Sequence, residues 1–397
     1  MRWLIAEDSL ESRKGHWFEY LQGFMRKLPL LGDEVEIAVS RTADTFIEEQ
    51  LGALRILPDS AFSKMSDGAP GWKRYARIPL HALRTYGSIR KYFKKSHPPD
   101  VIFVPTVLIH HLLGWFFLQK LGVIPKRSRV ILFFPGLPIQ LKNNEPTLNG
   151  SPTSKLLRLL LHFLRKEIIQ GKIILGVETI AMLDAANRIF SVPFTYFPHP
   201  VDPVSLNTSS NDSRSPVIMA CYGPARSEKG SDLLVKAIEM YLARNPKAQV
   251  RFVIQWIDDF TSPSGERITL PKAFYNNPRV EIIDRFFDDH EYGMRLASTD
   301  VLLLPYRRSS YGLRVSRVVI EAMVNGIPVI TTEKTTLADQ AASYGSALLT
   351  ADEDADCLER CIDSAVDRQK ELMERGVAQR VVARGHFSVE SFRRILV

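Results

Sequence analysis

Residues 300–332 contain two short apolar runs joined by a segment of helical composition, and this pattern restricts the fold more than any other part of the chain. Residues 301–304 read VLLL, which is typical of a strand buried on both faces. The segment 318–324 is apolar at every position but one and predicts a helix buried on nearly all sides. We expect Ser316 to cap this helix and Gly326 to end it in a left-handed conformation. The next strand then begins at Pro328.

The predicted helix carries two charges on one face. Arg317 and Glu321 are four residues apart, so their side chains are neighbours on the helix surface. In one interpretation they form an ordinary ion pair on an exposed stripe. In the other, they face a cleft, and the N-terminus of the helix points at an anion. The sequence leaves both interpretations open.

The composition is that of an ordinary globular chain. A length of 397 residues favours two or three domains. Of these residues 45% are hydrophobic and 24% are charged, as in ordinary globular proteins. No apolar run reaches the roughly 18 residues that span a bilayer. Three cysteines are too few, and too poorly spaced, for a disulfide framework or a zinc site. Met1 is followed directly by the strand-like RWLIAE, so we expect no signal peptide and a cytoplasmic location.

The positive charge lies in the first half of the chain. Residues 1–202 hold 27 Lys and Arg against 18 Asp and Glu (27 − 18 = +9), whereas residues 203–397 hold 25 against 26 (25 − 26 = −1). The helical region 72–97 has eight basic residues and no acid, and we expect Pro79 and Gly87 to break or bend it. This region is either a solvated face or a surface for acidic lipid headgroups or lipid phosphate. Nucleic acid is disfavoured, because no groove-reading or RNA-binding motif is present.

Another amphipathic segment lies at 154–169. Its apolar face is wide and its polar stripe narrow, which fits either a well-buried helix or a helix in a membrane interface. We favour burial.

The order of predicted elements indicates two doubly wound α/β domains. A strand at 2–8, a loop with Lys14, Gly15 and His16, a helix at 16–28 and a strand at 35–40 open the first domain. The Gly15 loop is also compatible with a simple tight turn. A Ser- and Asn-rich stretch at 203–215 reads as a linker. We therefore expect domains at 1–202 and 216–384, followed by a C-terminal helix within 385–397.

The second domain begins with a loop suited to an anion. After an apolar strand, Gly223 permits a sharp turn, and Ser231 or Asp232 is expected to cap the next helix. Arg226 and Lys229 lie in the loop that leads to the N-terminus of this helix. Its backbone N–H groups, its dipole and the two cations all favour a diphosphate. The aspartates at 258, 259, 288 and 289 suggest helix caps and loop solvation better than a metal site.

Two motifs resemble nucleotide-sugar glycosyltransferases of the GT-B fold, especially the retaining family-four group. One is Gly223-x-x-Arg226-x-Glu228-Lys229-Gly230. The other comprises Glu321, Ala322, Met323, Gly326, Pro328 and Val329. The family has an earlier Glu, separated from the last one by seven residues, and this chain has Leu313 at that position. A variant of the family reads Tyr-x-x-Arg-x-Ser, which Tyr311, Arg314 and Ser316 match.

The resemblance implies two Rossmann-like domains that face a cleft, an acceptor-binding domain first and a nucleotide-sugar-binding domain second. It implies that the C-terminal helix packs back toward the first domain. Arg226 and Lys229 would stabilise the leaving diphosphate, and Glu321 would accept hydrogen bonds from the ribose. The other implied donor-site residues are Gly223, Asp284, Arg285, Tyr306, Tyr311, Arg314, Ser316, Arg317 and Val318. The loop Lys14, Gly15 and His16 would approach the donor phosphates or the acceptor.

The function implied by the resemblance is transfer of a hexosyl or deoxyhexosyl group with retention of configuration, without metal or cofactor. The acceptor would be a glycan or lipid-linked glycan used in cell-surface polysaccharide or glycoconjugate synthesis, at the inner face of a membrane. Two departures keep an alternative open. Leu313 replaces the first Glu, and Pro135 and Gly136 stand where many members carry a His. The alternative is a non-catalytic GT-B protein that binds nucleotide or a partner protein.

Overall fold

The computed structural model describes residues 1–13, 17–61, 71–142, 145–204, 216–262 and 264–397. The loop residues Lys14, Gly15 and His16 and most of the expected linker, 205–215, lie outside this described part. The chain divides into two compact units. Unit 1 comprises Met1–Pro200 and Phe392–Val397, and unit 2 comprises Val201–Ser391.

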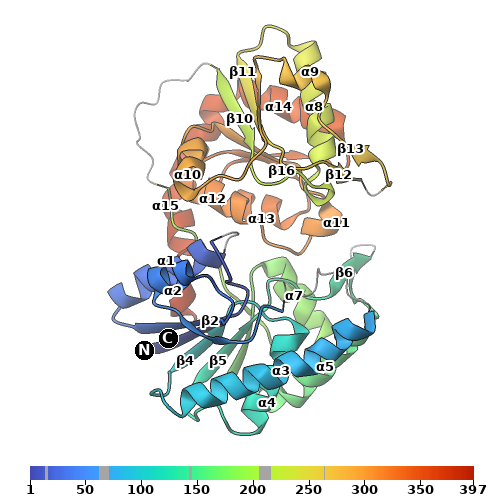
Figure 1. Ribbon diagram of the computed structural model, residues 1–397. Coiled ribbons are helices and arrows are strands. Elements are labelled where there is room, and N and C mark those ends of the chain that lie inside the picture. The colour runs from blue at the N-terminus through green and yellow to red at the C-terminus, as the bar shows by residue number, and fades with distance from the viewer. Residues whose placement is uncertain (14–16, 62–70, 143–144, 205–215, 263) are drawn as a thin grey trace. The chain divides into compact units, whose positions relative to one another are not determined.

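Unit 1 is built on a seven-stranded sheet in the order β3-β2-β1-β4-β5-β8-β9, with every pairing parallel. Helices cover both faces of this sheet (Figure 1). Its strands are β1 (Arg2–Glu7), β2 (Glu34–Ser40), β3 (Leu54–Leu57), β4 (Val101–Val104), β5 (Arg129–Phe133), β8 (Ile173–Val177) and β9 (Thr195–Tyr196), and β6 (Ile139–Lys142) and β7 (Glu145–Leu148) form a separate hairpin. Its helices are α1 (Trp17–Leu30), α2 (Thr45–Leu51), α3 (Gly71–Phe93), α4 (Ile109–Lys120), α5 (Pro152–Phe163), α6 (Arg165–Ile169) and α7 (Ile180–Ile189).

The end of the chain contributes to the core of unit 1. The helix α16 (Val389–Arg394) carries Phe392, whose ring centroid lies 4.6 Å from that of Phe197 and 5.1 Å from those of Phe24 and Phe103. The next residue, Arg393, donates two hydrogen bonds to the carboxylate of Asp33, at 2.6 and 3.0 Å. Aromatic packing and this bidentate ion pair hold the last residues in unit 1.

The basic helix α3 runs without interruption through Pro79 and Gly87, so the expected break is wrong. Both residues are exposed, and the carbonyl left without a partner before Pro79 can bond water. The other side of α3 packs closely on α4. A Cβ added at Gly114 of α4 would lie 3.3 Å from Thr85 and 3.4 Å from Ala82. Packing at this crossing stabilises the helix more than the single proline weakens it.

The segment 154–169 forms two helices, α5 and α6, which meet at the fully buried Leu164. Ser151 caps α5 by accepting a hydrogen bond from the N–H of Ser154. The predicted burial holds for most of the apolar face but not for all of it. Leu159, Phe163 and Ile169 remain exposed.

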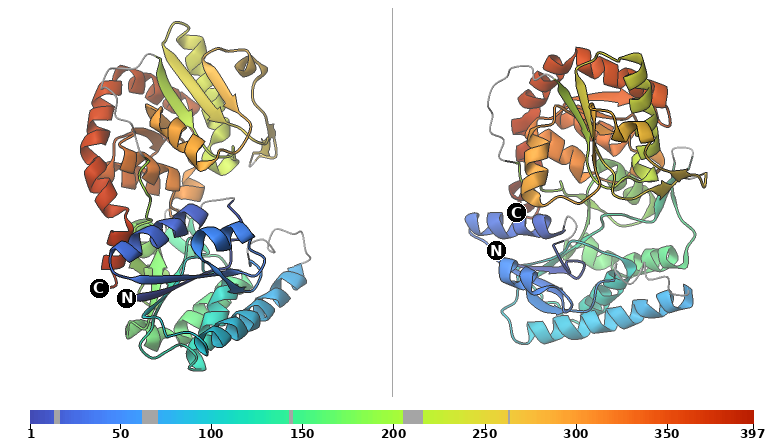
Figure 2. Two further views of the ribbon diagram at one scale, coloured as in Figure 1. Left: turned by 60° about the vertical axis from the view of Figure 1, so that its left-hand side comes forward. Right: turned by 45° about the horizontal axis from the view of Figure 1, so that its top comes forward.

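Unit 2 is built on a six-stranded parallel sheet in the order β14-β11-β10-β15-β16-β17. Helices again cover both faces, as the turned views in Figure 2 show. Its strands are β10 (Val217–Cys221), β11 (Val250–Gln255), β14 (Val280–Ile283), β15 (Val301–Leu304), β16 (Val329–Thr332) and β17 (Ala347–Thr350), and β12 (Phe260–Thr261) and β13 (Arg267–Ile268) form a hairpin. Its helices are η1 (Ser227–Lys229), α8 (Ser231–Arg244), α9 (Lys272–Tyr275), α10 (Asp289–Ala297), α11 (Arg308–Tyr311), α12 (Arg317–Asn325), α13 (Thr336–Tyr344), α14 (Ala355–Asp367) and α15 (Gln369–His386).

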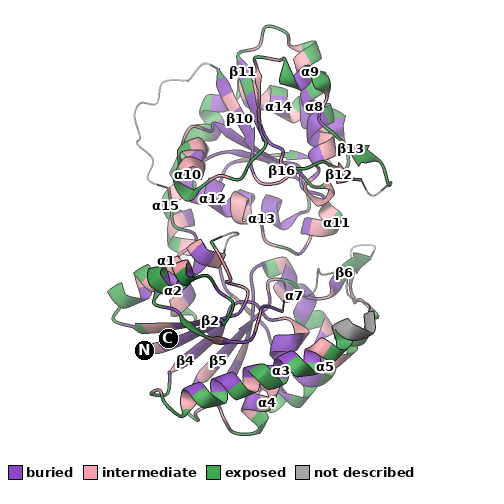
Figure 3. Cartoon of the chain, viewed as in Figure 1, coloured by how far each residue is buried: buried purple, intermediate pink, exposed green. Residues whose placement is uncertain are grey.

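The predicted unit of strand, helix and strand at 300–332 is present as β15, α12 and β16. Figure 3 shows buried residues along the strands of the two sheets and exposed residues on the outer sides of the helices. Helix α12 is buried from Val319 to Asn325, as its composition predicts, and Gly326 ends it with φ +75°. Ser316 is the N-cap residue, but its side chain accepts no hydrogen bond from the first turn, so the expected side-chain cap is wrong. The two units confirm the predicted doubly wound α/β fold. In the described part of the chain, no helix is both long enough and apolar enough to cross a membrane.

Candidate functional site

The carboxyl ends of four neighbouring parallel strands bring polar groups to one edge of the sheet of unit 2. Gln255, at the end of β11, connects two of the loops that leave this edge. Its side-chain oxygen accepts a hydrogen bond from the N–H of Gly223 at 2.6 Å, and its amide donates to the carbonyl of Arg285 at 2.7 Å. Gln255 is buried, and no motif in the sequence indicated its role.

The loop after β10 forms the 3-10 turn η1 and then enters α8 at Gly230. Gly230 has φ +64°, and a Cβ there would lie 2.1 Å from the carbonyl oxygen of Pro305, so only glycine fits. Gly230 is the N-cap residue of α8 and offers no side-chain cap. The expected capping by Ser231 or Asp232 is therefore wrong. Ser231 instead accepts a hydrogen bond from the N–H of Arg226 at 3.0 Å. The first turn of α8 thus has no side-chain cap, which suits an anion.

Lys229 places its ammonium over this loop. A Cβ at Gly223, which has φ +90°, would lie 2.5 Å from Lys229 Nζ, so the glycine makes room for the cation. Nζ also lies 5.8 Å from the ring centroid of Tyr306, within the range of a cation–π contact. Among the described residues, no carboxylate oxygen lies within 4.0 Å of it. Burial lowers the pKa of Lys229, because a partly buried ammonium loses hydration.

The second predicted cation of the loop, Arg226, is exposed. One guanidinium nitrogen lies 3.6 Å from a carboxylate oxygen of Glu228. Arg226 and Lys229 therefore belong to one short loop but differ in environment. Lys229 is the partly buried cation, and Arg226 can move through solvent toward a ligand.

Arg307, which sequence reasoning missed, fixes this loop to the end of β15. Its buried guanidinium bonds the Asp232 carboxylate at 2.7 and 2.9 Å and the Glu353 carboxylate at 2.6 and 3.1 Å. The same group donates to the carbonyl of Ser227, and the backbone N–H of Arg307 donates to the carbonyl of Glu228 at 3.1 Å. These bonds join η1, α8 and the segment after β15 into one rigid assembly.

Glu321 is only 6% exposed, so it does not lie on an exposed stripe, and that part of the first interpretation is wrong. The ion pair itself is present, with Arg317 Nε 2.8 Å from one carboxylate oxygen. The other oxygen accepts a hydrogen bond from the hydroxyl of Tyr292 at 2.5 Å. Burial and the Glu321 charge together raise the pKa of Tyr292 well above its usual range. A carboxylate oxygen can accept more than one hydrogen bond, so these contacts do not by themselves exhaust the acceptor capacity of Glu321.

Two further predicted residues, Tyr306 and Tyr311, lie side by side. Their ring centroids are 4.6 Å apart, and the guanidinium of Arg314 lies 5.2 Å from the Tyr311 ring. Arg314 is exposed and Leu313 is buried, so an apolar side chain fills the position of the family's first Glu. Val318 is half-buried in the first turn of α12. The aromatic pair thus connects the loop of residues 223–230, called the Lys229 loop below, with the segment that leads into α12.

The loop after β14 is more open. Asp284 and Arg285 are both exposed, and Arg285 forms a bidentate ion pair with Glu291 at 2.6 and 2.8 Å. Asp288 caps α10 by accepting a hydrogen bond from the N–H of Glu291 at 2.8 Å, which confirms its predicted role as a helix cap. The structure places Asp284 and Arg285 at the same sheet edge as Gly223, but neither contacts the Lys229 loop through a described hydrogen bond.

Unit 1 holds a buried cluster that the sequence did not reveal, because its members are far apart along the chain. His81 Nε2 and His111 Nε2 each lie 2.8 Å from the same oxygen of Asp8, and the ligand atoms of the three residues lie within 4.8 Å of one another. Burial alone would raise the pKa of Asp8. The two histidines outweigh this effect and hold that pKa well below its usual range. The neighbouring Glu7 shows the opposite shift, since burial and the Asp8 charge raise its pKa to about 7.

The spacing of this cluster would suit a metal ion, but the hydrogen bonds favour a different interpretation. The backbone N–H of Leu108 donates to His111 Nδ1 at 3.0 Å. A neutral His111 must then carry its proton on Nε2, the atom that faces Asp8. A metal would need the lone pair of that nitrogen. The cluster therefore fits a hydrogen-bonded network, in which both histidines donate to Asp8, better than a coordination site.

Comparison with known proteins supports the interpretation of unit 2. Residues 216–368 match the family described as Glycosyl transferases group 1. No curated protein matches the chain significantly by sequence.

Solved structures share the fold of the whole chain. A glycosyltransferase from Rickettsia africae is 13% identical, with a TM-score of 0.67 and coverage of 99% of this chain and 96% of that one. Anabaena HepE in complex with UDP and glucose is 12% identical, with a TM-score of 0.63 and coverage of 100% and 98%. Sucrose-phosphate synthase from Thermosynechococcus elongatus is 15% identical, with a TM-score of 0.62 and coverage of 100% and 97%. The chain therefore shares its fold with these solved structures, and residues 216–368 match the family described as Glycosyl transferases group 1.

Proposed function

We propose that this protein transfers a sugar from a nucleotide-diphosphate donor, and that the donor diphosphate binds at the Lys229 loop of unit 2. The observation that carries the proposal is the partly buried ammonium of Lys229, which has no carboxylate within 4.0 Å in the described part of the chain. An anion there would restore the electrostatic balance that burial disturbs. The N-terminus of α8, which has no side-chain cap, and the exposed Arg226 supply further positive potential.

The mechanism follows from the charge that develops. As the bond between sugar and phosphate breaks, negative charge grows on the leaving diphosphate. Lys229, Arg226 and the N–H groups at the start of α8 stabilise that charge as it forms. Glu321, held by Arg317 and Tyr292, accepts hydrogen bonds from the ribose hydroxyls. The resemblance to the retaining family-four group leads us to propose retention of configuration and a reaction that uses no metal.

The neighbouring structures suggest which donor to test first. Anabaena HepE binds UDP and UDP-glucose in its solved complexes, which supports a uridine diphosphate donor and a hexosyl or deoxyhexosyl group. Asp284 and Arg285, at the same sheet edge, are the proposed contacts to the base. Tyr306, Tyr311 and Arg314 are the proposed contacts near the sugar and phosphates.

For the acceptor, we propose a glycan or lipid-linked glycan in cell-surface polysaccharide or glycoconjugate synthesis, with the protein at the cytoplasmic face of a membrane. The basic charge of residues 1–202 supports this proposal. So do exposed apolar side chains that lie among cations, such as Leu83 on α3, which is 62% exposed, and Phe163 on α5. Such a surface suits anionic lipid headgroups.

A thermal-shift panel of UDP, GDP, ADP, dTDP and CMP, followed by a transfer or donor-hydrolysis assay with the best nucleotide, tests the donor site. A nucleotide that binds the folded state raises Tm by mass action. Arg226→Gln should lower turnover more than about tenfold, equivalent to about 1.4 kcal/mol of transition-state stabilisation. Lys236→Gln, on the exposed side of α8, is the matched control and should leave turnover unchanged.

Unchanged turnover in Arg226→Gln would remove its catalytic role. Nucleotide binding without transfer or hydrolysis would favour the non-catalytic alternative, for which the buried Leu313 in place of the family's first Glu is the supporting observation.

A further inference from the structure

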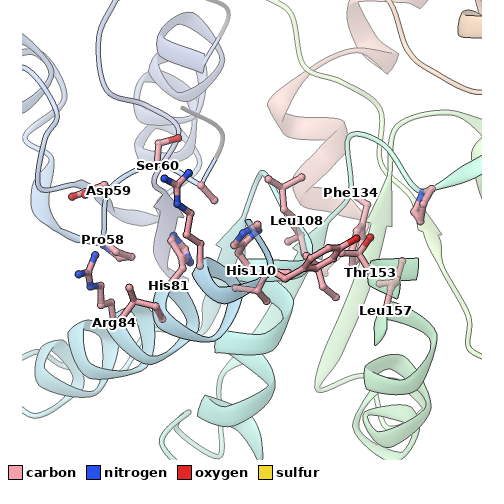
Figure 4. Close-up of a pocket in the computed structure, with 18 of the residues that line it drawn as sticks. Pro58, Asp59, Ser60, His81, Arg84, Leu108, His110, Phe134, Thr153 and Leu157 are labelled. Carbon is pink, nitrogen blue, oxygen red and sulfur yellow. The ribbon is translucent and has the colours of Figure 1, made fainter. Parts of the chain in front are cut away.

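Unit 1 contains a cavity of about 650 Å³ that lies outside the donor site. It is bordered by the loop after β3, by α3, by the start of α4, by the segment after β5 and by α5 (Figure 4). Its volume falls in the range of small-molecule sites, which is about 300–1,000 Å³. Its walls are mainly apolar and include Ile78, Leu108, Phe134, Leu137 and Leu157.

The polar groups of this cavity include two arginines and two histidines. Arg77, His81 and Arg84 are spaced at i, i+4 and i+7 on α3, so all three lie on one face of the helix, and all line the cavity. Arg84 is exposed, and within the described residues it pairs with no carboxylate. One acid, Asp59, also lines the space. The cavity therefore combines an apolar interior with an excess of positive charge.

His110 points independently to a ligand. It lines the cavity, is only 8% exposed, and its Nδ1 has no hydrogen-bond partner among the described residues. A buried polar atom without a partner is unfavourable unless a ligand or water satisfies it. Burial and the neighbouring His111 and His81 lower the pKa of His110 to about 4, so the ring is neutral near pH 7. Figure 4 shows the rings of His81 and His110 rising from neighbouring helices.

The Asp8 network fixes the orientation of His81, whose ring lies against that of His110. His81 donates its Nε2–H to Asp8, and its ring lies edge to face with that of His110, at a centroid distance of 5.8 Å. A group held in this way is pre-organised for a ligand and loses little freedom on binding.

The mouth of the cavity is also apolar. Tyr75 and Leu80 both line it, and they are 49% and 48% exposed. Leu83, one turn along α3 from Leu80, is exposed as well. Large apolar side chains in contact with water beside a basic, apolar cavity suit an amphiphile whose chain continues past the mouth.

We propose that this cavity is part of the acceptor site and that it holds the lipid phosphate of a lipid-linked glycan, with the apolar chain against its walls and the phosphate near Arg77 and Arg84. His110 donates to or accepts from a polar group of the same molecule. This inference rests on the proposed glycosyltransferase function, because it names the class of acceptor for that reaction. A lipid phosphate is favoured over a free sugar, since the walls offer few partners for many hydroxyls.

The test is isothermal titration of the full chain with dodecyl phosphate below its micellar concentration. Inorganic phosphate and dodecyl maltoside serve as the two comparison ligands. We expect saturable binding of dodecyl phosphate, binding of dodecyl maltoside at least about tenfold weaker, and no saturation by inorganic phosphate in the same range. Equal binding of dodecyl maltoside would overturn the role of the arginines. Equal binding of inorganic phosphate would overturn the role of the apolar walls.

Three variants locate the binding. Gly136→Phe places a ring at the edge of the cavity, where an added Cβ meets no atom within 4 Å, so its effect on folding should be small. Arg84→Gln removes a cation, and His110→Phe keeps the ring without its nitrogen atoms. Each variant should raise the Kd for dodecyl phosphate at least about tenfold. Lys126→Gln, an exposed loop residue outside the cavity, is the control for charge and should bind as the wild type does. Wild-type affinity in all three cavity variants would overturn the assignment.

A parallel titration with UDP separates this inference from the proposed function. UDP binding and sugar transfer without dodecyl phosphate binding would contradict the proposed acceptor site and leave the proposed transferase function intact. In the opposite outcome, dodecyl phosphate binds, the cavity variants lose this binding, and no nucleotide binds. That result would contradict the proposed transferase function and support a lipid-phosphate site. Unchanged circular dichroism and Tm in the variants show that a loss of binding is not a loss of folding.

Discussion

Replacement of Lys229 by methionine should have opposite effects on the free protein and on its complex with a nucleotide diphosphate. Methionine retains most of the length of the side chain and removes its charge. In the free protein the ammonium is partly buried, contacts the Tyr306 ring and has no carboxylate within 4.0 Å in the described part of the chain. Lys229→Met should therefore raise the Tm of the free protein. Each 1 kcal/mol gained corresponds to about 2–4 °C for a domain of this size.

In the complex, the variant loses a charged contact to phosphate. Two unit charges 4 Å apart interact by about 4 kcal/mol at an effective dielectric constant of 20. After desolvation, a hydrogen bond to a charged group contributes about 1.5–3 kcal/mol net. Because 1.4 kcal/mol is a factor of ten, the Kd for UDP should rise roughly 10- to 150-fold.

The pH dependence provides an internal check on the free protein. Burial lowers the pKa of Lys229 in the folded state, so the unfolded state binds the proton more tightly. Stability should therefore rise with pH between the lowered pKa of the folded protein and the ordinary lysine value of about 10.4. Lys229→Met lacks this increase, so the advantage of the variant in free energy of unfolding should shrink as the pH approaches 10.

The assays are urea unfolding at several pH values and calorimetric titration with UDP, with Lys236→Met on the exposed side of α8 as the matched control. An unchanged Kd for UDP would refute the phosphate-binding role of Lys229. A lower Tm of the free variant would refute the claim that the ammonium is held at an energetic disadvantage.

Two further predictions concern stability. Gly230→Ala should lower the free energy of unfolding, measured by urea unfolding, by about 2–4 kcal/mol. The reason is that alanine is strained at φ +64° and its Cβ would collide with the Pro305 carbonyl. A change under about 0.5 kcal/mol would contradict the required close approach of Gly230 to Pro305. Glu7→Gln should remove a fall in wild-type stability between pH 4.5 and 7 of up to about 3 kcal/mol, since the folded state, with a Glu7 pKa of about 7, keeps a proton that the unfolded state has lost. Identical pH profiles for wild type and Glu7→Gln would disprove that assignment.

The local parts of the donor site could be predicted from the sequence. Gly223 was recognisable as a turn residue after the strand, Gly230 as the last residue of the family motif, and Lys229 as a cation in the loop that leads to the helix. The structure adds that both glycines have positive φ. Glu321 and Arg317 were paired by helical periodicity alone. Each of these inferences concerns residues within a few positions of one another, where backbone geometry fixes the relation between side chains.

The partners of these residues could not be predicted in the same way. Tyr292 reaches Glu321 from another helix, and Arg307 joins Asp232 to Glu353 across more than 120 positions of the chain. Capping was also decided by packing. Ser231 and Asp232 look like N-cap residues, but the close approach of Gly230 to Pro305 moves the helix start to the glycine and leaves both side chains for other partners.

The sequence by itself determined the alternation of strands and helices, the glycine-bounded loop with its two cations, and the concentration of positive charge in residues 1–202. These depend on periodicity, composition and spacing along the chain, which are local quantities. Only the tertiary structure decided that α3 continues through Pro79, that His81 and His111 share Asp8, and that His110 is buried beside a basic, apolar cavity. The physical reason is that burial and pairing of charges depend on which elements pack together, and packing brings together groups that are about a hundred residues apart in the sequence.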